Sequence, residues 1–133
     1  MAQSNIEVVR SYIDAVGRFD LGTASSMVPE DVIMHIPGRN PMSGEIRGRD
    51  GLIGMFEGTH DLSGGRMPVP EHDITSSEDH VVALLTRTIA GVEARAAVVY
   101  HVMDGKITEI WPHEQDQYAL DEAVSGGDAQ QSG

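Results

Sequence analysis

The stretch VVYHVMDGKITEIWPHEQD, residues 98–116, decides the fold of this chain. Two runs rich in β-branched and aromatic residues flank the pair Asp104-Gly105. An Asp-Gly pair supplies the positive φ angles that a two-residue hairpin turn requires. The stretch therefore predicts two antiparallel strands that meet at a tight turn. Pro112 is expected to end the second strand, because a proline cannot donate to the ladder.

A two-residue turn also predicts the register, with His101 opposite Thr108 and Val99 opposite Ile110. Because side chains alternate along a strand, these four residues should share one face. That face mixes aliphatic groups with an imidazole and a hydroxyl, which is typical of a pocket lining. The opposite face is also largely apolar and holds Val98, Tyr100, Val102, Ile107, Glu109 and Trp111.

Composition restricts the classes of function. The 133 residues indicate one domain with one core, and 40% of them are hydrophobic. The formal net charge of −12 disfavours binding to nucleic acid or to an anionic membrane surface, and its plainest consequence is solubility. Cysteine, a membrane-spanning apolar stretch and a signal-peptide pattern are all absent from the sequence. We therefore expect a cytoplasmic protein without disulfides or thiolate chemistry.

Helical signals dominate the first part of the chain. Ser4 and Glu7 form a capping box, and the apolar residues that follow at helical spacing predict a helix. Asp20 is placed to cap a second, short helix. A third helix is expected to begin at Arg49 and to end before a loop at residues 59–65.

The other segments predict a sheet. Strands are expected at residues 32–36, 67–75, 80–89 and 94–103, followed by the second strand of the central hairpin. A turn-rich loop is expected at residues 37–44 and a short helix at residues 118–124. This order indicates an α+β fold, a meander sheet with helices on one face. We predict a single domain over residues 1–124 and a disordered tail over residues 125–133, because the tail has nothing to bury.

Both faces of the last strands carry apolar side chains. Helices can cover only one face of an antiparallel sheet, so the other face needs a second cover. The simplest cover is the same sheet of a second copy, and we therefore expect a homodimer through the sheet. A monomeric mass by light scattering at micromolar concentration would contradict this expectation.

The six histidines raise the question of a metal site. No two of them have the His-x-His or His-x-x-x-His spacing that gathers ligands on one element, so we expect no metal. His101 is different, because it lies in the middle of a strand on the mixed face. A neutral imidazole there could donate to an enolate or accept a proton. The alternative is a core histidine that bonds to Thr108.

Three further residues have two interpretations each. Asp116 follows the last strand, where a carboxylate at the mouth of an apolar pocket suits a general base, but it is equally placed to cap the last helix. Tyr12 lies beside the apolar stripe of the first helix, either as a core residue or as a hydroxyl donor. Trp111 could stack on a planar ligand, but it shares a face with His101 only if the strand contains a bulge. A place in the core or in an interface is its plainer interpretation.

Several features occur together in this chain. They are Tyr12 in the first helix, residues 32–37, the stretch Gly44-x-x-x-Gly48-x-x-Gly51-Leu52-Ile53, Phe56, and residues 104–111. In this combination, over about residues 4–123, the chain resembles the nuclear transport factor 2-like (NTF2-like) or SnoaL-like superfamily. The resemblance implies an α+β cone, in which a curved, mostly antiparallel sheet packs on N-terminal helices. It specifies the fold better than the reaction.

Within this superfamily the chain is most similar to polyketide cyclases of the SnoaL type. The resemblance implies an acid/base aspartate just after the last strand and a histidine on the strand before it, at about the places of Asp116 and His101. It also implies proton abstraction next to a carbonyl, stabilisation of the enolate and intramolecular carbon–carbon closure, without a cofactor.

Two other relatives match less well. Tyr12 corresponds to the first-helix tyrosine of ketosteroid isomerase, which donates to the oxyanion. The position of the base aspartate in that enzyme is occupied by Ile36, and its second aspartate falls near Val99 or His101. Limonene epoxide hydrolase needs an Asp-Arg-Asp constellation, and strand arginines such as Arg87 lack carboxylates at matching places.

We therefore predict a cofactor-free acid/base enzyme, a cyclase or isomerase, that acts on a hydrophobic polyketide-like or cyclic carbonyl compound. Asp116 would be the base and His101 the proton partner, with Tyr12 and His35 as supporting donors. His35 lines the pocket only if its neighbour Met34 does not, because the two alternate. The residues predicted to contact the substrate are Trp111, Phe56, Met34, Ile110 and Arg87. The alternative is a non-catalytic dimeric module that holds a small ligand or a protein segment.

Overall fold

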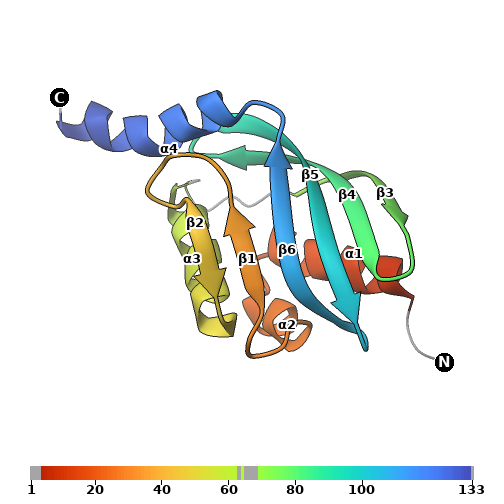
Figure 1. Ribbon diagram of the computed structural model, residues 1–133. Coiled ribbons are helices and arrows are strands. Elements are labelled where there is room, and N and C mark those ends of the chain that lie inside the picture. Colours follow the sequence, from red (N-terminus) through yellow and green to blue (C-terminus); the bar gives the residue numbers. More distant parts are fainter. Residues whose placement is uncertain (1–3, 63, 65–68, 133) are drawn as a thin grey trace.

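The computed structural model describes residues 4–62, 64 and 69–132, and it contains a six-stranded curved sheet with helices on its inner side (Figure 1). In chain order the elements are α1 (Asn5–Gly17), α2 (Leu21–Ser26), β1 (Ile33–Ile36), β2 (Gly44–Arg47), α3 (Arg49–Leu62), β3 (Glu71–Ser76), β4 (His80–Ile89), β5 (Val92–Met103), β6 (Lys106–Glu114) and α4 (Gln117–Ser132). The strand order is β2-β1-β6-β5-β4-β3, and only β1 and β6 pair in parallel. The predicted α+β cone is confirmed.

The N-terminal helices begin where their caps predict. The Ser4 side chain accepts a hydrogen bond from the Glu7 amide and also bonds the Glu7 carboxylate, so the capping box is present. Asp20 caps α2 by accepting from the Thr23 amide and hydroxyl. Helix α1 packs against β3, β4 and β6, and this contact turns its apolar stripe towards the sheet.

The central hairpin has the predicted turn. Asp104 and Gly105 both have positive φ, 52° and 76°, as a two-residue primed turn requires. Met103 pairs with Lys106 as expected. Beyond this pair the predicted register is wrong, because a bulge places one extra residue on β6.

The bulge changes which side chains share a face. His101 is opposite Glu109 rather than Thr108, and Val99 is opposite Trp111 rather than Ile110. As a result, Ile110 lies on the inner face of the sheet, whereas His101 and Trp111 lie together on the outer face. The inner face instead carries Val98, Tyr100, Val102, Ile107, Ile110 and Pro112, all of them buried.

Several predicted boundaries are corrected by the structure. Residues 44–47, at the end of the expected loop, form the short edge strand β2, which is mostly exposed and so carries little apolar signal. Helix α3 continues through the loop expected from residue 59, because the buried Thr59 hydroxyl donates to the Met55 carbonyl within the helix. Strand β3 begins at Glu71; residues 67 and 68, where it was expected to start, lie outside the described residues.

Pro112 does not end β6, which continues to Glu114. Strand β1 pairs with β6 only as far as Ile110, so at Pro112 the strand has β5 as its single neighbour. A proline is tolerated at such an edge position. Helix α4 begins one residue before the expected start of the last helix and continues beyond residue 124, whereas the disorder expected after that residue stays a prediction.

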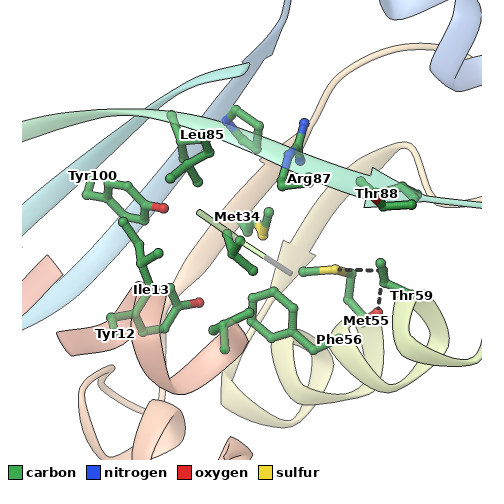
Figure 2. A pocket seen from close by; sticks show the side chains of 15 residues that line it. Tyr12, Ile13, Met34, Met55, Phe56, Thr59, Leu85, Arg87, Thr88 and Tyr100 are labelled. Atoms are coloured by element: carbon green, nitrogen blue, oxygen red, sulfur yellow. Dashed lines mark hydrogen bonds between the residues drawn. The ribbon is translucent and has the colours of Figure 1, made fainter. Parts of the chain in front are cut away.

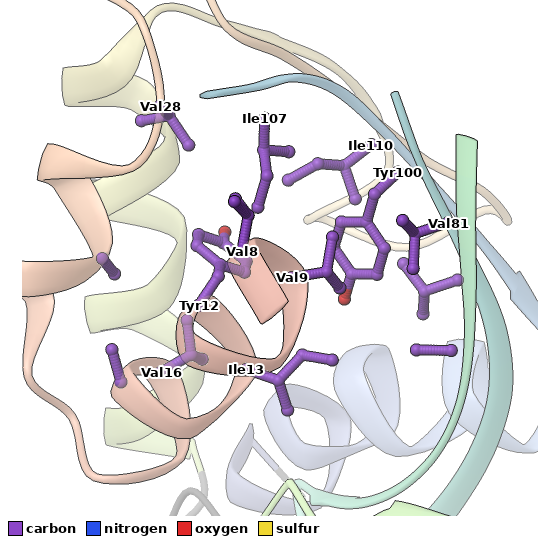
Figure 3. Packing of buried hydrophobic residues seen from close by; sticks show 14 of the residues in the cluster. Val8, Val9, Tyr12, Ile13, Val16, Val28, Val81, Tyr100, Ile107 and Ile110 are labelled. Carbon is purple, nitrogen blue, oxygen red and sulfur yellow. The ribbon is translucent and has the colours of Figure 1, made fainter. Parts of the chain in front are cut away.

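The core fills the space between α1, α2, α3 and the inner face of the sheet. Figure 3 shows Val9 and Ile13 of α1 facing Tyr100 and Ile110 of the sheet. Eight large side chains in this core are almost completely inaccessible: Leu52, Ile107, Ile110, Val8, Val9, Val28, Val32 and Val81. In the described part of the chain, no helix is long and apolar enough to cross a membrane.

Candidate functional site

A cavity of about 100 Å³ lies between α1, α3 and the inner face of the sheet, beyond the end of the packed core (Figure 2). Its walls are mostly apolar, and three phenyl-type rings from α1, α3 and β5 contribute to them. The lining residues are Tyr12, Ile13, Val16, Met34, Met55, Phe56, Thr59, Val69, Leu85, Arg87, Thr88, Ile89, Val98, Tyr100 and Pro112.

Two tyrosines supply hydroxyl groups to this cavity. Tyr12 packs against Phe56 and Tyr100, with ring centroids 6.3 Å and 6.1 Å away. The Tyr12 hydroxyl is buried and has no hydrogen-bond partner among the described residues. Leaving a buried hydroxyl unpaired costs stability, so this group is available to an acceptor on a ligand. Burial raises the pKa of Tyr12 and that of Tyr100, so both stay protonated donors at neutral pH.

A second, smaller void of about 60 Å³ adjoins the first and extends under α4. Leu120 and Val124 of α4 form its outer wall. Gly38, with φ +95°, lets the loop after β1 approach α4 so closely that a Cβ atom there would collide with Gln117. The contact is secured by Asp121, whose pKa is lowered by hydrogen bonds from the Arg39 amide and the Asn40 side chain.

A buried ion pair stands where the two voids meet. Arg87 of β4 lines both voids, and Glu114 at the end of β6 lines the second. The Arg87 Nη2 donates to the Glu114 Oε1, and the two side chains are only 17% and 4% exposed. They meet across β5, where Ala94 is opposite Arg87 and Ala96 is opposite Glu114, so small side chains leave room for the pair. The Arg87 Nε is buried without a partner in the described part of the chain.

The structure does not bring His101 and Asp116 together at the cavity, so the predicted convergence of these two groups is wrong. His101 lies on the outer face, where its Nδ1 is 2.6 Å from the Thr108 hydroxyl and its Nε2 is 3.7 Å from Asp79. The alternative of a histidine bonded to Thr108 is therefore the observed one. Asp116 is exposed, and its Oδ1 accepts from the Ala119 amide, which is the capping role at the start of α4.

His35 and Trp111 also lie on the outer face, away from the cavity. Met34 lines the cavity, so alternation turns His35 outward, where its Nε2 is 2.5 Å from a Glu109 carboxylate oxygen. The His35 and Trp111 rings stack with centroids 5.6 Å apart. Ile110 is on the inner face but belongs to the packed core. Within the described ranges, no group of three His, Asp or Glu side chains is arranged to hold a metal ion.

Four of the predicted residues do surround the cavity, namely Tyr12, Met34, Phe56 and Arg87 (Figure 2). Their roles in binding or catalysis stay predictions. The sequence interpretation missed Tyr100 and Glu114. The alternation of the hairpin does place Tyr100 opposite in face to His101, so the correct inner face would have included it. No sequence signal marks Glu114, because its partner Arg87 is distant along the chain and reaches it across another strand.

Burial of the two tyrosines predicts that the protein loses stability in alkali. An unfolded tyrosine ionises near pH 10, whereas the pKa values of Tyr12 and Tyr100 are raised in the folded state. Their contribution to stability is therefore complete below about pH 10 and is lost as the pH rises towards the folded values. Urea unfolding at about pH 8, 10 and 11 should show this decline, and a Tyr100→Phe variant should show a smaller one. An equal decline in both proteins would contradict the assignment.

The fold and the cavity define a class of protein, a cone of helices and curved sheet around a small apolar site. The model of the SnoaL-like domain matches residues 9–110, and the chain belongs to this family. A protein of unknown function from Xanthomonas campestris, described as having a cystatin-like fold, is 30% identical, with a TM-score of 0.83 over 92% of this chain and 99% of that one. An uncharacterized protein of Mycobacterium tuberculosis is 27% identical over 112 residues, 80% of this chain and 86% of that protein. TerC, which was co-crystallized with polyporic acid, shares the fold, with 21% identity and a TM-score of 0.78 over 90% of this chain and 97% of that one.

Proposed function

We propose that this protein is an acid/base enzyme of the SnoaL-like type, needing no cofactor, that acts on a small and mostly apolar carbonyl compound. The observation that carries the proposal is the buried Tyr12 hydroxyl, which faces an apolar cavity without a partner among the residues described. A donor held in this way is suited to a carbonyl oxygen and to the oxyanion that forms from it. The similarity in fold to TerC, co-crystallized with polyporic acid, supports a small-molecule ligand.

The size of the cavity limits the substrate. An engineered cavity of about 150 Å³ holds one benzene molecule. The main cavity, at about 100 Å³, and the adjoining void, at about 60 Å³, are each smaller than that. A substrate with several fused rings, such as a steroid, therefore does not fit unless the walls move. A compound with a single ring or a short chain is the class that the main cavity favours.

The chemistry we propose is proton transfer beside the carbonyl group. The Tyr12 hydroxyl would donate to the carbonyl oxygen and stabilise the enolate by the same hydrogen bond. Glu114 is the one carboxylate among the described residues that lines either void, and it would accept the proton from the neighbouring carbon. Return of that proton to a different carbon gives an isomer, and attack of the enolate carbon on a second carbonyl gives a ring. Arg87 would hold the carboxylate in position.

A second candidate is the non-catalytic binding module. The observation that favours it is the ion pair itself, because a carboxylate that is held by a guanidinium is a weak base. Both candidates use the same cavity. The homodimer through the sheet stays a prediction, and its interface would be the outer face, where Leu84 is 40% exposed and Val99 and Trp111 are half-buried.

Hydrogen–deuterium exchange into a ketone distinguishes the two candidates. Acetophenone in D₂O exchanges its methyl protons through the enolate, and NMR follows this exchange directly. We expect the wild-type protein to accelerate exchange by about 10²-fold or more over buffer. The double variant Arg87→Met/Glu114→Leu should still bind the ketone but should exchange it near the background rate. Binding without acceleration in the wild type supports the binding module, and absence of binding by calorimetry overturns both candidates.

A further inference from the structure

The two voids of the candidate site are separated by side chains rather than by backbone. Met34 from β1 and Met55 from α3 each line both voids, and Figure 2 shows them between the tyrosine end of the cavity and Arg87. We refer to these two side chains as the methionine partition. The larger void lies on the side of Tyr12, and the smaller one lies on the side of Glu114 and α4.

The partition consists of the most adaptable apolar side chains available. Methionine is unbranched and has three rotatable bonds, so it changes rotamer at low cost and fills irregular gaps. The polar contact at the Met55 sulfur is weak, a Thr59 hydroxyl 3.6 Å away, which Figure 2 marks. Neither side chain is fully buried, and both pack at the margin of the core. Nothing in these contacts fixes the two sulfur-bearing chains in their present rotamers.

Both ends of the combined space carry an unpartnered polar atom. At one end, the Tyr12 hydroxyl has no partner in the described chain. At the junction, the same is true of the Arg87 Nε, beside the carboxylate of Glu114. Buried polar atoms of this kind indicate a ligand with acceptors at both places. A single-ring compound in the main cavity reaches the first of these places, whereas only a longer molecule extends past the partition.

We propose that Met34 and Met55 swing aside to join the two voids, and that the physiological ligand is an elongated molecule of two lobes. One apolar lobe carries a carbonyl group to Tyr12, and the second lobe passes Arg87 and ends beneath Leu120 and Val124 of α4. This inference rests on the proposed function and specifies its substrate class. Met34 and Met55 are then the residues that determine how long a ligand the protein accepts.

The test compares two ketones that differ by one ring, acetophenone and 4-acetylbiphenyl. Calorimetry on the wild-type protein should give a dissociation constant at least about tenfold lower for 4-acetylbiphenyl, because a second ring is buried. Isoleucine is close to methionine in size, but its branched Cβ stiffens the side chain. The Met34→Ile and Met55→Ile variants should therefore lose this preference, to within about threefold, and keep their affinity for acetophenone.

The control is Met103→Ile, the same change at an exposed position next to the hairpin turn, which should leave the preference intact. Thermal unfolding of each variant checks that it is folded. Wild-type protein that binds acetophenone but not 4-acetylbiphenyl more tightly overturns the partition while the proposed function stands. Isoleucine variants that retain the wild-type preference overturn it as well. Failure of the wild type to bind either ketone removes the proposed function, and the partition with it.

Discussion

Replacing Glu114 by leucine is expected to lower the free energy of unfolding by about 3–5 kcal/mol. The Glu114 side chain is 4% exposed and is the ion-pair partner of Arg87, which is itself 17% exposed. Without the carboxylate, the guanidinium remains in a mostly apolar wall with an uncompensated charge. An arginine does not escape this cost by losing its proton, because its pKa is too high. Urea unfolding followed by circular dichroism measures the change.

A double variant and a surface control make this prediction specific. In Arg87→Met/Glu114→Leu both charges are replaced by apolar groups, so most of the lost stability should return. Arg10→Met breaks a pair of similar geometry, with 3.0 Å between Arg10 Nε and Glu71, but the Arg10 side chain is 54% exposed. Solvent screens that pair, so its loss should cost less than about 1 kcal/mol. Equal effects of Glu114→Leu and Arg10→Met would show that the Arg87–Glu114 pair is not a buried one.

The Tyr12→Phe variant should change stability and function in opposite directions. The Tyr12 hydroxyl is buried without a partner among the residues described, so removing it should raise the free energy of unfolding by about 1 kcal/mol. If the same hydroxyl stabilises an oxyanion, its removal should lower the rate of ketone exchange by about 10²–10³-fold. Few substitutions in a core improve stability, so the combination is diagnostic of a donor kept for a ligand.

Thermal unfolding and the acetophenone exchange assay together measure both effects. Tyr118→Phe is the matched control, because Tyr118 is 88% exposed and lies outside the cavity. That control should leave stability and exchange close to the wild-type values. A destabilised Tyr12→Phe protein would indicate that the hydroxyl has a structural partner. Unchanged exchange with normal binding would remove Tyr12 from the proposed chemistry.

The elements that the sequence predicted well are those with local signals. The capping box of Ser4 and Glu7 satisfies its donors within one helical turn, so no distant residue is needed to begin α1. The turn at Asp104-Gly105 depends on two residues that tolerate positive φ. Strand β2 was missed for the complementary reason. It is short and exposed, and it exists because β1 is there to pair with it.

The candidate site was predicted only in part, and one bulge explains the main error. Ile107 and Ile110 both point inward although three positions separate them, which strict alternation forbids. A one-residue shift moves a whole set of side chains to the other face, so His101 and Trp111 went outward together. Tyr12 was identified correctly as a cavity residue because the spacing of α1 alone places it beside the apolar stripe.

The sequence by itself therefore determined the α+β cone, its family and the helix that presents Tyr12, since each depends on periodicities and turns that act over a few residues. The tertiary structure alone decided which face of the hairpin lines the cavity, because the bulge forms between two strands and leaves no mark in either one. It also decided that Arg87 would meet Glu114. Their contact crosses β5 and depends on the small side chains of Ala94 and Ala96, a relation that exists only once three strands are side by side.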